Sequence, residues 1–134
     1  MITGVNHIGV VVDSIDSTLA LMTKCFGAKE VERHHFVQLG QVSCIVELGD
    51  LRVELMEPMG EDGVVAKFLS NHGQGLHHVS LWSDDLDHDC AELEKEGVTV
   101  IGKSQNGEIQ AAFTHPRSTF GVLFEISSIR SHGR

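Results

Sequence analysis

The sequence is poor in cysteine and in long apolar runs. Its three cysteines are an odd number and no two have Cys-x-x-Cys spacing, which argues against a disulfide framework and a thiolate zinc site. No apolar run approaches the roughly 20 residues that span a bilayer. The chain also starts with a strand pattern, without a basic region followed by an apolar one. We therefore expect a cytoplasmic protein with no membrane partner.

Positive charge is also scarce, because 10 Lys and Arg face 19 Asp and Glu, giving a formal net charge of −9. Nucleic acid is therefore disfavoured as a partner, since phosphate contacts need a basic face. An anionic ligand would have to be bound by individual residues, for which the candidates are Arg33, Arg52, Lys103 and Arg117. With 134 residues, 41% of them apolar, the chain is long enough for one domain with a core.

An internal duplication organises the chain. Glu54 follows His7 after 47 residues, and Glu125 follows His78 after the same interval. One offset of 71 residues carries the first pair onto the second, and the residues that follow the two histidines obey it too. A duplication of this kind can bring all four side chains to a pseudo-twofold axis.

Each copy begins with a strand and a helix. Residues 5–12 are a β-rich run, residues 13–14 offer a helix N-cap, and apolar residues then recur at steps of three and four up to Gly27. The second copy repeats this plan with a strand over residues 76–83 and a helix that stops at Gly97. The pattern predicts an amphipathic helix after the first strand of each copy.

A hairpin follows in the first copy. Residues 42–48 and 51–57 are two strand patterns joined by the short turn Gly49-Asp50. If the strands pair around this turn, Ile45 lies opposite Glu54. Glu54 then projects from the face opposite to the apolar one.

These patterns predict an α+β fold in which each half has the order β-α-β-β-β. We expect a single domain over residues 1–134, with modules at about 1–60 and 72–130 and a connector helix at about 61–71. Residues 131–134 are expected to fray.

Four residues are the candidate metal ligands: His7, Glu54, His78 and Glu125. Two imidazoles with two carboxylates make a mixed nitrogen and oxygen site that suits a divalent ion. Burying two carboxylates together without a cation would be costly, because like charges at close range cannot both stay ionised.

The remaining histidines have weaker claims. His77 adjoins His78 but points to the opposite strand face. His34 and His35 are expected in a loop, as solvated polar residues. His115 precedes a proline at a turn and is a candidate hydrogen-bonding residue in a cavity.

Several segments carry a family resemblance that covers nearly the whole chain. They include Val-Glu-Leu-Met-Glu-Pro at 53–58, Gly-Leu-His-His at 75–78 and His-Pro-Arg-Ser-Thr at 115–119. The chain resembles the vicinal oxygen chelate superfamily and, within it, the methylmalonyl-CoA epimerase family. The resemblance implies two tandem βαβββ modules that form a cleft-bearing curved mixed sheet with the helices outside.

The resemblance also implies a metal-dependent epimerase that acts on methylmalonyl-CoA or a related 2-substituted acyl-CoA. A proton would leave and return through a metal-stabilised enolate, with Co, Ni, Mn or Zn as the metal ion. Glu125 would be the first catalytic base. Arg117 would bind a phosphate of the acyl-CoA, and His115 and Ser43 would border the substrate. A homodimer is expected.

The chain departs from this family before the first hairpin, where the family often carries a glutamate close to the second catalytic base. Residues 38–43 read Gln-Leu-Gly-Gln-Val-Ser, without a carboxylate. Glu47, a nearby carboxylate on the Glu54 face of the hairpin, is therefore the candidate for the second base, although it could instead pair with Arg52.

Two alternatives remain open at this point. A glyoxalase I-like lactoylglutathione lyase shares the His/Glu/His/Glu ligand set, but its first helix bears a tyrosine, and this chain has no tyrosine. A non-catalytic small-molecule binding or resistance protein of the same fold would generally lack the four ligands. Ring-cleaving dioxygenases use two His and one Glu, so a fourth ligand argues against that chemistry.

Overall fold

The computed structural model describes residues 1–129, which fall into two compact units. The N-terminal unit is His7–His77, and the C-terminal unit combines Met1–Asn6 with the chain from His78 onward. Strand β1 (Ile2–Val11) crosses the boundary, so it gives its first residues to one unit and its last residues to the other. The predicted fraying of residues 131–134 lies outside the described residues.

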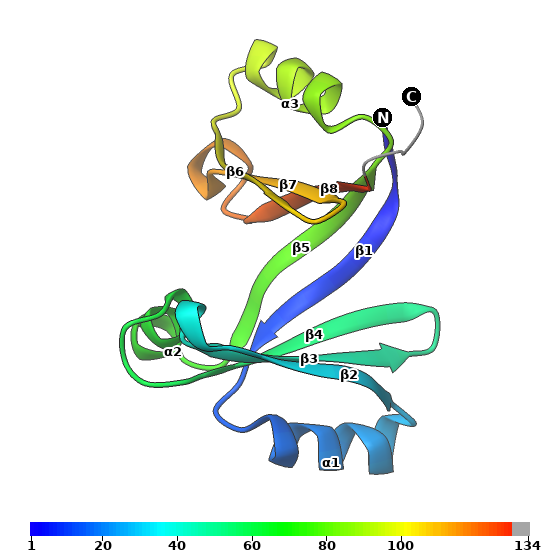
Figure 1. Ribbon diagram of the computed structural model, residues 1–134, viewed down its shortest axis with the longest axis vertical. Helices are drawn as coiled ribbons and strands as arrows, with labels where there is room; N and C mark the ends of the chain where they lie inside the picture. The colour runs from blue at the N-terminus through cyan, green and yellow to red at the C-terminus, as the bar shows by residue number, and fades with distance from the viewer. Residues whose placement is uncertain (130–134) are drawn as a thin grey trace. The chain divides into compact units, whose positions relative to one another are not determined.

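The N-terminal unit is a four-stranded mixed sheet with two helices (Figure 1). Its strands run in the order β2-β3-β4-β1, with β1 parallel to β4 and the other neighbours antiparallel. After β1 its elements are α1 (Ile15–Phe26), β2 (Lys29–Phe36), the 3-10 turn η1 (Val37–Leu39), β3 (Gln41–Leu48), β4 (Leu51–Pro58) and α2 (Val64–His72).

The C-terminal unit repeats this plan, with strands in the order β1-β5-β8-β7-β6 and β5 parallel to β8. Its elements are β5 (Gly75–Ser83), α3 (Leu86–Lys95), β6 (Val100–Asn106), β7 (Ile109–Thr114), the 3-10 turn η2 (Pro116–Ser118) and β8 (Phe124–Ile129). Each copy of the duplication therefore has the predicted order β-α-β-β-β. The α+β class and the mixed sheet are confirmed.

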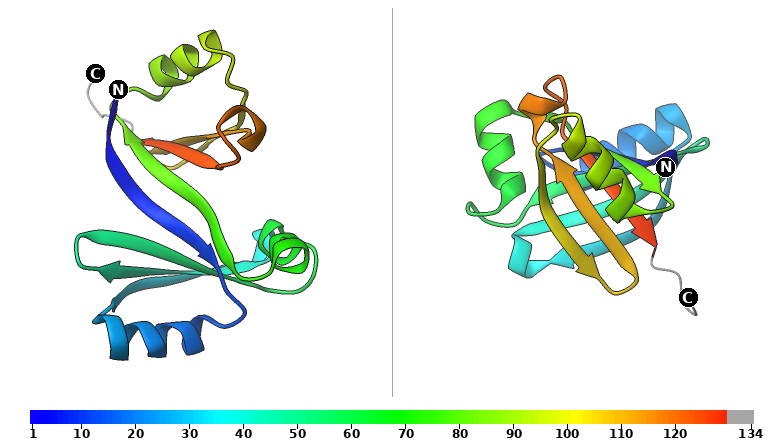
Figure 2. Two further views of the ribbon diagram at one scale, coloured as in Figure 1. Left: turned by 180° about the vertical axis from the view of Figure 1, so that it is seen from behind. Right: turned by 90° about the horizontal axis from the view of Figure 1, so that it is seen from above.

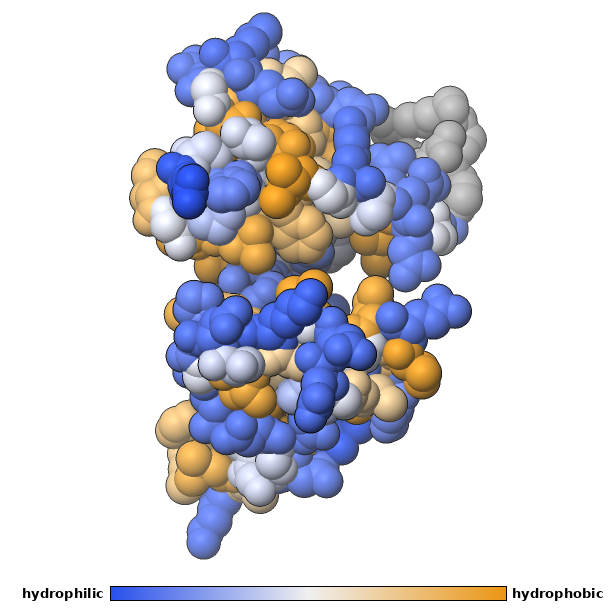
Figure 3. Space-filling model, turned by 90° about the vertical axis from the view of Figure 1, so that its left-hand side faces the viewer, coloured by the Kyte–Doolittle hydropathy of each residue, from blue (hydrophilic) through white to orange (hydrophobic). Residues whose placement is uncertain are grey.

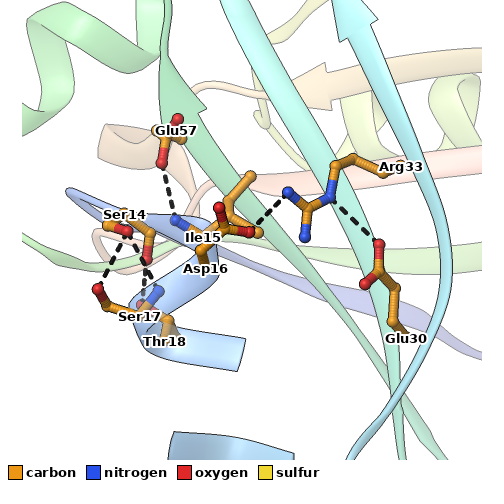
Figure 4. A network of polar contacts seen from close by, with 8 residues as sticks. All are labelled: Ser14, Ile15, Asp16, Ser17, Thr18, Glu30, Arg33 and Glu57. Carbon is orange, nitrogen blue, oxygen red and sulfur yellow. Dashed lines mark hydrogen bonds and ion pairs between the residues drawn. The ribbon is translucent and has the colours of Figure 1, made fainter. Parts of the chain in front are cut away.

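At the start of helix α1, one hydroxyl oxygen and one carboxylate oxygen accept hydrogen bonds from backbone N–H groups of its first turn (Figure 4). The Oγ of Ser14 accepts a hydrogen bond from the backbone N–H of Ser17 at 3.1 Å, as an N-cap does. The N–H of Ile15 donates to Oε1 of Glu57 on β4 at 2.8 Å. The helix ends at Gly27, which adopts the left-handed conformation with φ 70°. Both predicted ends of this helix are thus confirmed.

One face of the sheet is covered by α1 in the N-terminal unit and by α3 in the C-terminal unit (Figure 2), and a hydrophobic core lies between each helix and its sheet. A second cluster, Val11, Met56 and Val65, packs α2 against β1 and β4. In the N-terminal unit, Ile15 of α1 packs with Cys44, Val46 and Leu55 of the hairpin, and each of these is at most 1% exposed. In the C-terminal unit the buried residues are Leu86, Cys90, Ala112 and Ile126. Glu54 and Glu125 alternate with core residues along their strands, so both project from the sheet face away from α1 or α3.

The hairpin has the predicted register, with Leu48 opposite Leu51 and Ile45 opposite Glu54. The expectation of a loop at His34 and His35 is wrong, because both lie in β2. The order β-α-β-β-β includes this strand, but its extent was not located because its side chains are mostly exposed and therefore show no apolar alternation.

In residues 1–129 no helix is long and apolar enough to span a membrane. The surface nevertheless mixes hydrophobic with hydrophilic residues (Figure 3). Phe120 is 89% exposed and Val37 72% exposed. The homodimer stays a prediction.

Candidate active site

In the N-terminal unit, the sheet brings His7 and Glu54 together. β1 and β4 run parallel with Gly9 opposite Glu54, which places His7 two residues from the point of pairing and on the same face. Nε2 of His7 lies 3.4 Å from Oε1 of Glu54, and the two side chains are only 15% and 18% exposed. The duplication's first His and Glu therefore form a largely buried pair.

The C-terminal unit builds a second pair in the same way. β5 and β8 run parallel with Ser80 opposite Glu125, so His78 also lies two residues before the point of pairing. Nε2 of His78 is 4.0 Å from Oε1 of Glu125, with exposures of 7% and 18%. Phe113 lies opposite Glu125 on β7, and its ring meets the His78 ring edge to face with centroids 6.5 Å apart.

Each pair has donor atoms that suit a divalent metal ion. Ligand atoms bound at about 2.1 Å to one ion lie about 3.0–3.4 Å apart at octahedral or tetrahedral angles. The 3.4 Å separation of His7 from Glu54 meets this requirement, and the 4.0 Å separation of His78 from Glu125 needs a small side-chain adjustment. Within each pair, an imidazole nitrogen and a carboxylate oxygen are donor types expected for such an ion.

Two further candidates, Ser43 and Glu47, lie on β3. Side chains at positions 43, 45 and 47 point to the same face of β3. Ile45 lies opposite Glu54, so Ser43 and Glu47 share the sheet face of Glu54. Ser43 is only 2% exposed and its Oγ accepts a hydrogen bond from Nε2 of Gln41 at 3.1 Å. Glu47 is exposed, lies close to the hairpin turn and pairs directly with Arg52 in register.

His115 and Arg117 lie together at the start of η2. Nδ1 of His115 accepts a hydrogen bond from the backbone N–H of Arg117 at 3.2 Å, so this imidazole caps the turn. The Arg117 side chain is exposed, and in residues 1–129 no ion pair to a carboxylate is found for it. In contrast, Arg33 and Lys103 bind carboxylates, at 2.8 Å to Asp16 and 2.7 Å to Asp87.

Arg33 on β2 binds Asp16 of α1, which links the strand to the helix, and also binds Glu30 of its own strand (Figure 4). Hydrogen bonding to Asp16, followed by that to Glu30, raises the pKa of the Arg33 guanidinium against the opposing effect of burial. Arg33 is therefore engaged in structure, which weakens its claim as an anion-binding residue.

His77 belongs to the end of the N-terminal unit and packs against α2. Its ring meets the Phe68 ring edge to face, with centroids 5.0 Å apart. Burial lowers the pKa of His77, while the negative charge of Glu54 acts in the opposite direction.

A cavity of about 400 Å³ in the C-terminal unit lies away from the carboxylate face. Leu93 of α3 lines it together with Phe124 and Ile126, which flank Glu125 on β8 and point to the other face. The cavity is therefore on the helix side of the sheet, whereas Glu125 projects from the opposite side.

Sequence reasoning missed a polar pair on β2. Oε2 of Glu32 lies 3.3 Å from Nε2 of His34. Glu32 lies opposite Ile45, and His34 opposite Ser43, so both share the sheet face of Glu54. The alternation of Glu32 with His34 was the available signal, but it was masked by the expectation of a loop.

Known proteins resemble this chain over most of its length. The family model of the glyoxalase/bleomycin resistance protein/dioxygenase superfamily matches residues 6–113. A mitochondrial methylmalonyl-CoA epimerase of Dictyostelium discoideum is 30% identical over 126 residues, covering 90% of this chain and 75% of that protein. An ethylmalonyl-CoA/methylmalonyl-CoA epimerase of Cereibacter sphaeroides is 25% identical, over 96% of this chain and 100% of that protein.

A solved structure agrees with these relatives. A Streptomyces coelicolor methylmalonyl-CoA epimerase variant in complex with 2-nitronate-propionyl-CoA matches with a TM-score of 0.86 at 25% identity. The match covers 98% of this chain and 100% of that one.

Proposed function

The chain belongs to the glyoxalase/bleomycin resistance protein/dioxygenase superfamily and is an epimerase; we propose that it inverts C2 of methylmalonyl-CoA, or of a related 2-substituted acyl-CoA, with the help of a divalent metal ion. The observation that carries this proposal is the pair of matched His–Glu contacts, one in each copy of the duplication. The epimerases among its relatives supply the substrate class.

The proposed metal ligands are His7, Glu54, His78 and Glu125. Each copy offers one imidazole and one carboxylate, with little exposure to water. Co, Ni, Mn and Zn all accept this donor set, and affinity alone would not choose among them. When bound, the ion would act as a Lewis acid and stabilise the negative charge that develops on the substrate oxygens.

Glu125 is the proposed first catalytic base. The thioester carbonyl acidifies the hydrogen at C2, and a carboxylate within reach can remove it. The side chain is 18% exposed, so little water competes for its oxygens. Phe113, directly opposite on β7, adds an apolar wall beside it. Such a wall would favour an enolate that is shielded from bulk water.

A CoA thioester also carries phosphates, which this acidic chain must bind locally. Arg117 is the proposed contact, because its side chain is exposed and is not paired with a described carboxylate. The guanidinium of Arg33 and the ammonium group of Lys103, in contrast, each bind an aspartate. Ser43 and His115 are proposed to border the substrate, and the hydrogen bonds of both side chains would hold their orientation.

The test is solvent deuterium exchange at C2 of methylmalonyl-CoA, measured with protein loaded with Co²⁺, and run beside a glutathione hemithioacetal assay. We expect exchange and inversion with no hemithioacetal turnover. Glu125→Gln should abolish exchange and keep part of the metal affinity, because an amide oxygen still coordinates but takes no proton at neutral pH.

Glu54→Gln is the matched control, since it makes the same change in the other pair and should reduce exchange less. Equal loss in both variants would show that Glu125 is only a ligand. Hemithioacetal turnover without exchange at C2 would identify a glyoxalase instead.

A further inference from the structure

A β-bulge in the N-terminal unit aims one carboxylate at the Glu54 face. On β2, Glu30 lies opposite Val46 and Glu32 lies opposite Ile45. Val46 and Ile45 are adjacent on β3, whereas Glu30 and Glu32 are separated by one residue on β2. Val31 is the extra residue. In a regular strand Glu30 and Glu32 would share a face, but the bulge separates them.

The two glutamates consequently have different surroundings. Glu30 shares the core-facing side with Val46 and binds Arg33, with Nε of Arg33 3.2 Å from its Oε2. Glu32 shares the other side with Ile45 and contacts His34 at 3.3 Å. Bulges often re-aim a side chain beside an active site. Here the bulge creates an acid–base pair on the face that carries the proposed ligand Glu54.

Register places Glu32 in line with Glu54. Ile45 pairs with Glu54 on one side and with Glu32 on the other, so the three residues form one row across β4, β3 and β2. Neighbouring strands lie about 4.8 Å apart, which puts the backbones of Glu32 and Glu54 about 10 Å apart. The residue between them in this row is Ile45. Glu32 and Glu54 therefore project from the same sheet face with one residue between them.

Inversion at C2 requires a second proton-transfer group, since the proton must leave one side of the carbon and return to the other. Residues 38–43 contain no carboxylate for this role. Glu32 and Glu47 are both exposed, Glu32 to 51%, so exposure does not separate them. Glu47, however, lies beside the hairpin turn in the row of Arg52 and Lys29, whereas Glu32 lies in the row of Glu54. Glu32 therefore has the better position.

Resting on the proposed function, we propose that Glu32 is the second catalytic acid–base group and that His34 is its positioning residue. In one direction, the first base takes the proton from C2 and the electron pair of that C–H bond spreads onto the thioester. A new C–H bond then forms on the opposite side with a proton from the Glu32 carboxyl group. The enzyme ends with a proton gained at the first base and one lost at Glu32, and exchange with water restores both.

The experiment follows each C2 epimer of methylmalonyl-CoA separately in D₂O with the metal-loaded enzyme, recording deuterium uptake and inversion. The wild type should exchange and invert both epimers. Glu32→Gln should lower inversion by about 100-fold or more, as loss of an acid–base group does. It should still exchange one epimer, whose hydrogen faces the remaining base, with retention of configuration. His34→Gln should lower kcat by less and leave KM unchanged.

Two matched controls lie on the same strand. Glu30→Gln removes the same charge from the other side of the bulge, and His35→Gln removes an imidazole that pairs with Val42 on the other face. Both should invert substrate at close to the wild-type rate.

Inversion by Glu32→Gln within 2-fold of wild type would overturn the assignment, and so would equal loss of exchange from both epimers. A 100-fold loss in Glu47→Gln, with Glu32→Gln unaffected, would give the role to Glu47. If the wild type itself exchanges neither epimer, the proposed function fails, and this inference fails with it.

Discussion

Glu54 and Glu57 lie three residues apart on β4 and should respond oppositely to substitution. Glu57 points to the helix side, where its Oε1 accepts the backbone N–H of Ile15 at 2.8 Å, whereas Glu54 faces His7. One carboxylate thus holds a helix end, and the other is a proposed metal ligand. Separate measurements of stability and of metal affinity should distinguish the two roles.

The cost of losing Glu57 can be worked from its contact. A hydrogen bond to a charged group contributes about 1.5–3 kcal/mol. A negative charge at a helix N-terminus contributes about 0.3–1 kcal/mol, and because both effects come from the same carboxylate they overlap and are not added. Ile15 is 1% exposed, so water reaches its N–H poorly after the carboxylate is removed. We expect Glu57→Ala to lower the free energy of unfolding by about 2 kcal/mol, and Glu57→Gln by about 0.5–1 kcal/mol because the amide oxygen still accepts.

Urea unfolding of the metal-free protein, followed by far-UV circular dichroism, measures this loss. Thermal unfolding should give a decrease in Tm of about 8 °C for Glu57→Ala, since about 4 °C corresponds to 1 kcal/mol at this chain length. Titration of the folded variant with Co²⁺ should give wild-type affinity. Glu54→Gln should do the reverse, with metal affinity at least 10-fold weaker and metal-free stability within about 0.5 kcal/mol of wild type. Unchanged stability of Glu57→Ala would refute the helix-end argument.

Three further outcomes are expected. Saturating Co²⁺ should raise the Tm of the wild type, because a ligand bound only by the native state stabilises that state. His78→Ala should lose most of this rise in Tm, and an equal rise in both proteins would remove His78 from the ligand set. Arg117→Ala should raise KM for the acyl-CoA and lower kcat/KM by about 10-fold, or about 1.4 kcal/mol, and an unchanged KM would leave the phosphates to another residue. Burial raises the pKa of the Cys44 and Cys90 thiols, so only the exposed Cys25 should react with a thiol reagent in the native protein at pH 7. Fast labelling of all three cysteines would contradict the buried positions of Cys44 and Cys90.

The sequence predicted those parts of the fold that repeat or alternate. The 71-residue offset located both first strands and both first helices, and the short Gly49-Asp50 turn set the pairing of Ile45 with Glu54. These features depend on local chemistry and on regular spacing, which a single sequence displays. The same spacing identified the two His–Glu pairs before any geometry was known.

Other features depend on departures from regular spacing. The bulge at Val31 shifts β2 by one residue, so alternation alone would have placed Glu32 with Glu30. The hydrogen bond from the N–H of Ile15 to Glu57 joins residues 42 positions apart in the sequence, and no local motif predicts it. Such contacts follow from tertiary packing, so the sequence did not predict the Glu32–His34 pair or the contact of Glu57 with the start of α1.

The division of β1 between the two units bears on how the chain acquires its structure. The amino group of Met1 contacts Asp84 at 2.6 Å across a sequence separation of 83 residues, and the N–H of Asp84 donates to the carbonyl oxygen of Met1. During synthesis, the first residues of β1 therefore emerge long before β5 exists to pair with them. Their late docking gives the C-terminal unit a high contact order, which slows folding because a long loop must close first. A gene cut between the two copies would separate that unit from its own edge strand, so its product should fold only when the missing segment is supplied in trans.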